Sequence, residues 1–195
     1  SLLRRPGIQL TGDITPSYSA LRIGTLTEIK ANFEQRKVRL RPVFLMRDPI
    51  ERIISSQRMK LRKQNQLNHE AEVEALRQLC VEQPEMVTLR SDYGHTLRAL
   101  TQVFDPSECF IDLYERLFTP ASWQRLCDVL TVPYEEPEWE QQVNVSRTDT
   151  SIPDEVLAEL GAWQAPTMAA VRQTMGHLDL AQLWPLAHRW CTDFS

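Results

Sequence analysis

Charged and hydroxyl side chains follow a strongly apolar segment at a spacing that suits anion binding. Arg47 and Asp48 come directly after the apolar run 42–46, and Ser55 lies eight residues beyond Arg47. Asp48 is a good helix N-cap and Pro49 a good first helical residue, so we expect a helix to begin here. Asp48 and Ser55 would then project from one helix face, about 10 Å apart along the axis. A phosphate held by the forked Arg47 guanidinium and the Ser55 hydroxyl fits this arrangement, because free N–H groups and the helix dipole favour anions there.

The same residues also allow a purely structural interpretation. An Arg-Asp-Pro sequence after a strand can be a capped turn, with Asp48 and Arg52 paired across one helical turn. Asp13, which follows the short apolar stretch 8–11, can likewise be a turn residue ahead of Pro16. The residue types alone leave both alternatives open.

Alternating strand-like and helix-like segments are expected to position these side chains. Because strands alternate with helices, we predict an α/β class with a parallel sheet. Ligands of such sheets sit beyond the carboxyl ends of the strands, where Asp13 and Arg47 fall. The predicted strands are 8–11, 42–46 and 109–114, and the predicted helices are 21–33, 50–61, 69–81, 84–104, 120–130 and 153–174, the last with a break near Pro166.

Length and composition indicate one ordinary globular domain. The chain has 195 residues, of which 42% are hydrophobic and 25% charged. It contains no uncharged apolar stretch of about 18 residues and no secretory signal, so we expect no membrane span and a cytoplasmic location. The four cysteines are scattered without a C-x-x-C pair or a zinc spacing, which suits a reducing compartment and predicts no metal site.

The charge is unevenly distributed along the chain. Residues 1–63 carry 14 Lys and Arg against 5 Asp and Glu, a net charge of +9, while residues 64–195 carry 8 against 21, a net charge of −13. A basic half favours an anionic partner. The overall pI of about 5.6 and the absence of nucleic-acid-binding motifs argue against nucleic acid, so a small polyanionic ligand fits better.

Four short motifs, taken in order, resemble those of a known enzyme family. They are Gly12-Asp13-Ile14-Thr15-Pro16-Ser17-Tyr18, the segment 44–55 with its Arg-Asp-Pro and Ser55, Tyr114-Glu115-Arg116-Leu117, and Val143-Asn144-Val145-Ser146-Arg147. Together they resemble the PAPS-dependent sulfotransferases (PAPS is 3′-phosphoadenosine-5′-phosphosulfate), closest to the bacterial and heparan-sulfate-type branch. The resemblance spans roughly residues 8 to 176.

The resemblance implies a fold, a donor and an acceptor. The fold would be a P-loop-like three-layer α/β domain over residues 1–195, with a central parallel sheet and a helix-rich C-terminal half. The enzyme would transfer a sulfuryl group from PAPS, without a metal, to a hydroxyl or amine of a small-molecule, lipid or carbohydrate acceptor.

The resemblance also implies roles for particular residues. Arg47 and Ser55 would hold the 3′-phosphate, and Arg147 would add a further nucleotide contact. Asp13 would be the general base, a role that a modestly raised pKa assists. Ser91 and Tyr93 would line the acceptor cleft, although Tyr93 also suits a place at the edge of the core.

The sequence departs from the family pattern at the donor loop. The family grips the 5′-phosphosulfate with a glycine-rich loop that carries a Lys, but the sequence has no such loop and its first lysine is Lys30. We therefore expect the chain to begin part-way through a sulfotransferase domain. Two alternatives stay open, namely a non-catalytic nucleotide-binding module and a kinase-like P-loop enzyme in which Asp13 binds a metal.

Overall fold

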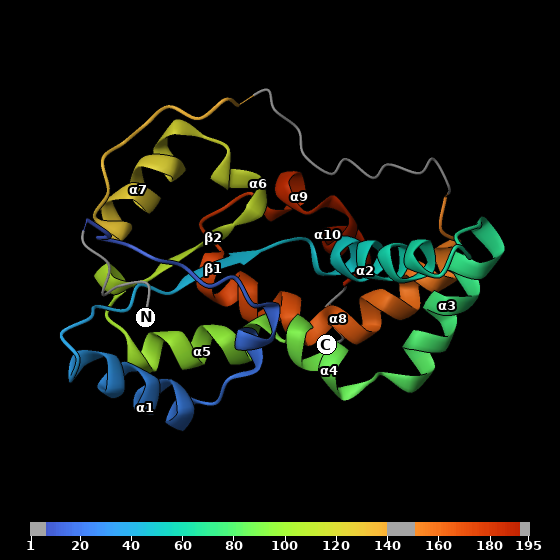
Figure 1. The fold of residues 1–195 in the computed structure, drawn as a ribbon. Coiled ribbons are helices and arrows are strands. Elements are labelled where there is room, and N and C mark those ends of the chain that lie inside the picture. The colour runs from blue at the N-terminus through green and yellow to red at the C-terminus, as the bar shows by residue number, and fades with distance from the viewer. Residues whose placement is uncertain (1–6, 140–150, 192–195) are drawn as a thin grey trace.

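The computed structural model describes residues 7–139 and 151–191 and is mostly helical, with 66% helix around a small parallel sheet (Figure 1). The strands β1 (Val43–Met46) and β2 (Phe110–Leu113) pair in parallel, with Val43 opposite Phe110 and Met46 opposite Leu113. Both strands were predicted from their apolar runs, and the observed fold belongs to the mixed α/β class.

Helices surround this sheet and account for most of the described chain. In the view of Figure 1, α1 and α5 lie below the strands, α6 and α7 lie above them, and α2, α3 and α8 gather beyond the head of β1. The helices are α1 (Ile23–Glu34), α2 (Pro49–Lys63), α3 (His69–Glu82), α4 (Glu85–Ser91), α5 (Tyr93–Val103), α6 (Tyr114–Leu117), α7 (Pro120–Leu130), α8 (Asp154–Met175), α9 (Leu180–Leu183) and α10 (Pro185–Trp190), with 3-10 turns η2 (Pro16–Ala20) and η3 (Pro106–Glu108).

The turn from β1 into α2 forms as its local sequence predicts. The Asp48 carboxylate accepts hydrogen bonds from the N–H groups of Ile50, at 2.9 Å, and of Glu51, at 3.2 Å, while Pro49 occupies the first helical position. Basic residues fill the last turn of α2, where they complement the helix dipole. The strand therefore passes directly into a well-capped helix.

The hydrophobic core lies where α2, α3, α5, α8 and α10 meet the carboxyl ends of the strands. Helix α8 contacts each of the other four helices. Its Gly161 permits the closest approach, because a Cβ at that position would lie 2.2 Å from the backbone oxygen of Trp190 on α10. Fully buried side chains include Met46, Ile50, Ile53, Leu76, Leu113, Leu160, Met168 and Trp184.

Three predicted elements differ from the structure. Residues 8–11 form no strand and are exposed, because within the described chain they have no neighbouring strand to pair with. The predicted helix 84–104 divides at Asp92, whose side chain accepts from the N–H of His95 and so begins a new helix. Helix α8 continues through Pro166 without a break. Pro166 has no N–H to donate to the carbonyl of Ala162 one turn earlier, but both residues are exposed, so water can bind that carbonyl.

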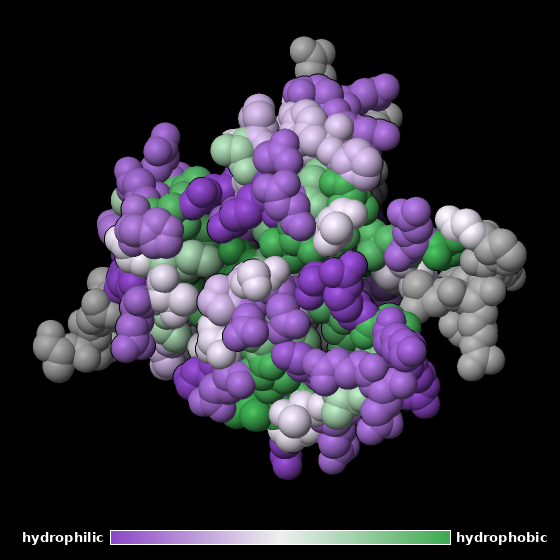
Figure 2. Space-filling model, turned by 90° about the vertical axis from the view of Figure 1, so that its left-hand side faces the viewer, coloured by the Kyte–Doolittle hydropathy of each residue, from purple (hydrophilic) through white to green (hydrophobic). Residues whose placement is uncertain are grey.

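The outer face of the molecule is predominantly polar. Figure 2 shows hydrophilic side chains over most of the face that looks left in Figure 1, with apolar patches between them. Some large apolar side chains are exposed, most of all Ile14 at 96%. Among the described helices, none is both long and apolar enough to cross a membrane.

Candidate functional site

Arg47 stands at the carboxyl end of β1 with its guanidinium open to solvent. The side chain is 41% exposed, and Nη2 donates to Glu51 Oε2 at 2.9 Å. The backbone oxygen of Arg47 accepts from the Tyr93 hydroxyl at 2.9 Å, which ties the end of the strand to α5. A ligand anion at Arg47 would therefore compete with the Glu51 carboxylate.

Ser55 lies on α2 one helical turn beyond Glu51, the residue that pairs with Arg47. Arg47 precedes the N-cap Asp48 and so lies outside the helix, but its side chain reaches Glu51 in the first turn of α2. Ser55 is half-buried, and no hydrogen bond of its hydroxyl is found in the described part of the chain. A cation at the end of β1 is thus followed by a carboxylate and a free hydroxyl on one face of α2, as far as the described residues show.

The N–H groups at the start of α2 are already occupied, in contrast to the expectation that they are free. Asp48 is 1% exposed, and while its Oδ1 caps α2, its Oδ2 accepts from the N–H of Ala187 at 2.9 Å. Burial raises the pKa of Asp48, and hydrogen bonds from Ala187, Glu51 and Ile50 oppose that shift. An anion at this site must therefore be held by side chains rather than by the backbone of α2.

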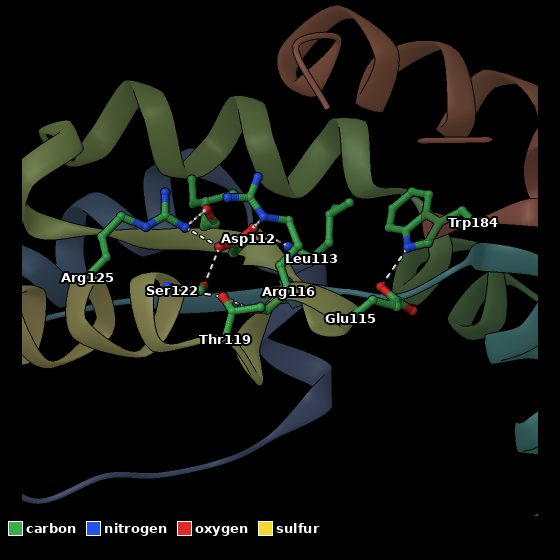
Figure 3. Close-up of polar contacts among 9 residues, drawn as sticks. Asp112, Leu113, Glu115, Arg116, Thr119, Ser122, Arg125 and Trp184 are labelled. Carbon is green, nitrogen blue, oxygen red and sulfur yellow. Dashed lines mark hydrogen bonds and ion pairs between the residues drawn. The ribbon is translucent and has the colours of Figure 1, made fainter. Parts of the chain in front are cut away.

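Glu115, in the Tyr-Glu-x-Leu motif, links three parts of the fold. Its Oε2 accepts from Trp184 Nε1 at 2.8 Å (Figure 3), and the backbone N–H of Asp48 also interacts with its carboxylate. Burial raises the pKa of Glu115, and the hydrogen bond from Trp184 lowers it in part. The residue therefore holds the ends of β1 and β2 against the C-terminal helices.

Asp112 on β2 forms a second buried acidic centre, which the sequence analysis did not single out (Figure 3). It is 1% exposed and accepts from Ser122 Oγ at 2.6 Å and from the Leu113 N–H at 2.8 Å. Arg125 donates to it, and Arg116 Nε lies 3.5 Å away. A lone aspartate inside the apolar run 109–114 is the signal that could have identified this network. Its partners lie on or beside α6 and α7, so it fixes those helices to the sheet.

Asp13 is exposed and belongs to a local hydrogen-bonded turn. Its two carboxylate oxygens accept from the Tyr18 hydroxyl at 2.6 Å and from Thr15 Oγ1 at 2.9 Å. These bonds, that from Tyr18 above all, lower the pKa of Asp13, and the bond to Asp13 raises the pKa of Tyr18. The direction is opposite to the raised pKa expected of a general base. In the described residues no hydrogen bond or ion pair joins Asp13 to Arg47 or Ser55.

Ser91 and Tyr93 are buried, at 1% and 3% exposure, in contacts within the protein. Ser91 Oγ donates to Val87 O at 2.8 Å and accepts from Arg52 Nη2. Arg52 therefore bonds to Ser91 and not to Asp48, the partner that the sequence suggested as an alternative. Burial raises the pKa of Tyr93 to about 12, which keeps its hydroxyl protonated. The structure brings Tyr93 to Arg47, whereas Arg147 lies outside the described residues.

The described chain contains no candidate metal cluster, and two of its cysteines are held as neutral thiols. No group of three His, Cys, Asp or Glu side chains there could hold a metal ion. Burial raises the pKa of both Cys80 and Cys109 to about 11, so these thiols stay protonated at neutral pH.

Comparison with protein-family models, with curated proteins and with solved structures found no match to this chain. The similarity to sulfotransferases therefore rests on the motifs themselves.

Proposed function

We propose that this chain carries the 3′-phosphate-binding site of a PAPS-dependent sulfotransferase, which acts on a hydroxyl or amine of a small-molecule, lipid or carbohydrate acceptor. The observation that carries the proposal is the cluster formed by the carboxyl end of β1 and the first turns of α2. There Arg47 offers a guanidinium whose side chain is 41% exposed, and Ser55 offers a hydroxyl with no hydrogen-bond partner among the described residues, at the spacing of the family motif. In the proposed P-loop-like three-layer fold, β1 and β2 would be neighbouring strands of the central sheet.

The ion pair between Arg47 and Glu51 does not prevent phosphate binding. Both side chains are more than one-third exposed, at 41% and 37%, so the pair contributes only about 0.2–1 kcal/mol. A phosphate dianion forms stronger, bidentate hydrogen bonds with a guanidinium. The 3′-phosphate would therefore take the place of the Glu51 carboxylate and reach Ser55 one turn further along α2.

In the proposed reaction the acceptor oxygen or nitrogen forms a bond to the sulfur of PAPS. The bond between sulfur and the bridging oxygen of the 5′-phosphate breaks, and adenosine 3′,5′-bisphosphate leaves with that electron pair. Asp13 would take the acceptor proton. The Tyr18 hydroxyl, which now donates to Asp13, occupies the position from which an acceptor hydroxyl would donate, so its displacement would also return the pKa of Asp13 toward its ordinary value.

The lack of a glycine-rich loop in the sequence favours a second candidate, a sulfotransferase-like module that binds the nucleotide without transferring the sulfuryl group. The first proposal assigns no 5′-phosphosulfate contact to these 195 residues. The module would be favoured if the protein bound adenosine 3′,5′-bisphosphate tightly but never converted PAPS to adenosine 3′,5′-bisphosphate in the presence of an acceptor.

Calorimetry with two nucleotides tests the proposal. We expect adenosine 3′,5′-bisphosphate to bind about tenfold or more tightly than adenosine 5′-monophosphate, since charge-assisted hydrogen bonds contribute about 1.5–3 kcal/mol. Arg47→Ala should remove that difference, and Arg77→Ala, which changes an exposed arginine paired with Glu155 on another face, should preserve it. Equal affinity of the unaltered chain for both nucleotides would refute the 3′-phosphate assignment.

A further inference from the structure

The guanidinium of Arg52 is partly buried without a balancing negative charge. Nη2 donates to Ser91 Oγ, while Nε is buried and has no hydrogen-bond partner in the described part of the chain. Among the described residues no carboxylate forms an ion pair with Arg52, whereas Arg58, six positions further along α2, pairs with Glu72. A cation removed from water without a counter-charge destabilises the protein that carries it. Arg52 therefore occupies a position that a negatively charged group would complete.

A second arginine adds to this uncompensated positive charge. Arg90 on α4 is the chain neighbour of Ser91, the residue that contacts Arg52. Arg90 is exposed, and its Nη2 donates to Ser17 Oγ at 2.9 Å, with no carboxylate partner in the described chain. Burial lowers the pKa of Arg52 and the nearby charge of Arg90 lowers it further, while the Tyr93 side chain opposes this shift. The fold thus brings two like charges near each other, and no described carboxylate pairs with either of them.

The arginine pair, Arg52 and Arg90, lies beside the segment that carries Asp13. Ser17, the partner of Arg90, follows Asp13 by four residues at the start of η2. Helix α5 holds η2 in place, because Thr96 Oγ1 donates to Ser19 O at 2.9 Å. The Arg47 guanidinium, in contrast, is paired with Glu51.

We propose that the arginine pair binds an oxyanion of the acceptor, a carboxylate, sulfate or phosphate group, so that the acceptor is an acidic molecule. This inference rests on the proposed function, because it takes Asp13 as the place where the acceptor reacts. Two guanidiniums offer forked donors that match the oxygens of such a group, and the Ser17 hydroxyl adds a further polar group beside them. The bound oxyanion would supply the missing counter-charge and hold the acceptor next to Asp13.

A sulfate titration followed by NMR tests the site directly. Sodium sulfate is added to the 195-residue chain at constant ionic strength, and the Nε–H resonance of Arg52 is observed. We expect a saturable shift, weakened about tenfold or more in Arg90→Glu and partly weakened in Arg90→Ala. Arg77→Glu makes the same charge change on α3 and should leave sulfate binding unaltered. No saturable shift in the unaltered chain, or unaltered binding in Arg90→Glu, would overturn the proposal.

Thermal unfolding and nucleotide binding complete the test. Arg90→Glu should raise the unfolding temperature in the absence of sulfate, because the new carboxylate can pair with Arg52. A lower unfolding temperature would show that the charge of Arg52 is already compensated. The variant should still bind adenosine 3′,5′-bisphosphate, and the nucleotide should not compete with sulfate. Competition would assign the arginine pair to the donor and overturn the acceptor inference. Failure of the 3′-phosphate assignment would show separately, as unchanged nucleotide binding in Arg47→Ala.

Discussion

Replacing Glu51 by Gln should strengthen nucleotide binding while weakening the fold. The carboxylate now pairs with Arg47 at 2.9 Å, and both side chains are more than one-third exposed, so the pair is worth about 0.2–1 kcal/mol. A bound phosphate must break this pair and also approach the negative charge of Glu51, which costs about 0.7 kcal/mol per unit charge at ~6 Å in water. Glu51→Gln removes both costs. The two costs together are at least about 0.9 kcal/mol, so we expect affinity for adenosine 3′,5′-bisphosphate to rise about fivefold or more, since about 1.4 kcal/mol corresponds to tenfold.

The same substitution should lower stability, because Glu51 lies in the first turn of α2. An acidic residue there stabilises a helix by about 0.3–1 kcal/mol through the helix dipole. Calorimetry measures the binding and urea unfolding the stability. The gain in affinity should shrink as salt is added. Glu155→Gln is the matched control, since Glu155 pairs with Arg77 at the same distance on another face. If Glu51→Gln bound the nucleotide no more tightly than Glu155→Gln, the placement of the phosphate at Arg47 would be wrong.

Three further substitutions test the scaffold of the site. Gly161→Ala should lower the free energy of unfolding by about 1–3 kcal/mol, because the new methyl group would press on the Trp190 carbonyl. Asp112→Ala should lower it by about 2–3 kcal/mol, because the buried hydrogen-bond network of β2 loses its acceptor. Burial raises the pKa of Glu115, so the folded protein keeps that proton to higher pH than the unfolded chain does, and its ionisation above the ordinary value of 4.5 reduces stability. Glu115→Gln, which can still accept from Trp184, should therefore flatten the fall in stability as pH rises from 4.5 toward neutral.

Urea unfolding measures all three effects. An unchanged midpoint in Gly161→Ala would contradict the close approach of α8 to α10, for which Gly24→Ala is the control, since a Cβ there meets no atom within 4 Å. For Asp112, a loss no larger than that in Asp128→Ala on the exposed face of α7 would show that the network contributes little. If Glu115→Gln kept the pH dependence of the unaltered chain, Glu115 would titrate normally in the folded state.

Local chemistry predicted the part of the fold that carries the candidate site. The apolar run ending at Met46, the cap Asp48 and the Pro49 that follows it are neighbours in sequence, so strand, turn and helix could be predicted together. The same reasoning failed for residues 8–11, because a strand needs a partner that the local sequence does not supply. It also missed the break at Asp92, where a side chain in the interior of an apolar pattern acts as a cap.

The contacts that complete the site join residues far apart in sequence. Asp48 accepts from Ala187, 139 positions later, and Glu115 from Trp184, 69 positions later. No spacing rule links such pairs, so the sequence could not show that the capping carboxylate of Asp48 is also buried against α10. The uncompensated charge of Arg52 is likewise visible only when its surroundings are known, because its place on α2 equally suits an ion pair.

A crystal structure of the chain with adenosine 3′,5′-bisphosphate tests the central claim most directly. We expect the 3′-phosphate within hydrogen-bond distance of both the Arg47 guanidinium and the Ser55 hydroxyl, with the Glu51 carboxylate turned away from Arg47. A nucleotide bound elsewhere, or an Arg47 that keeps its pair with Glu51 while the phosphate contacts other residues, would contradict the claim.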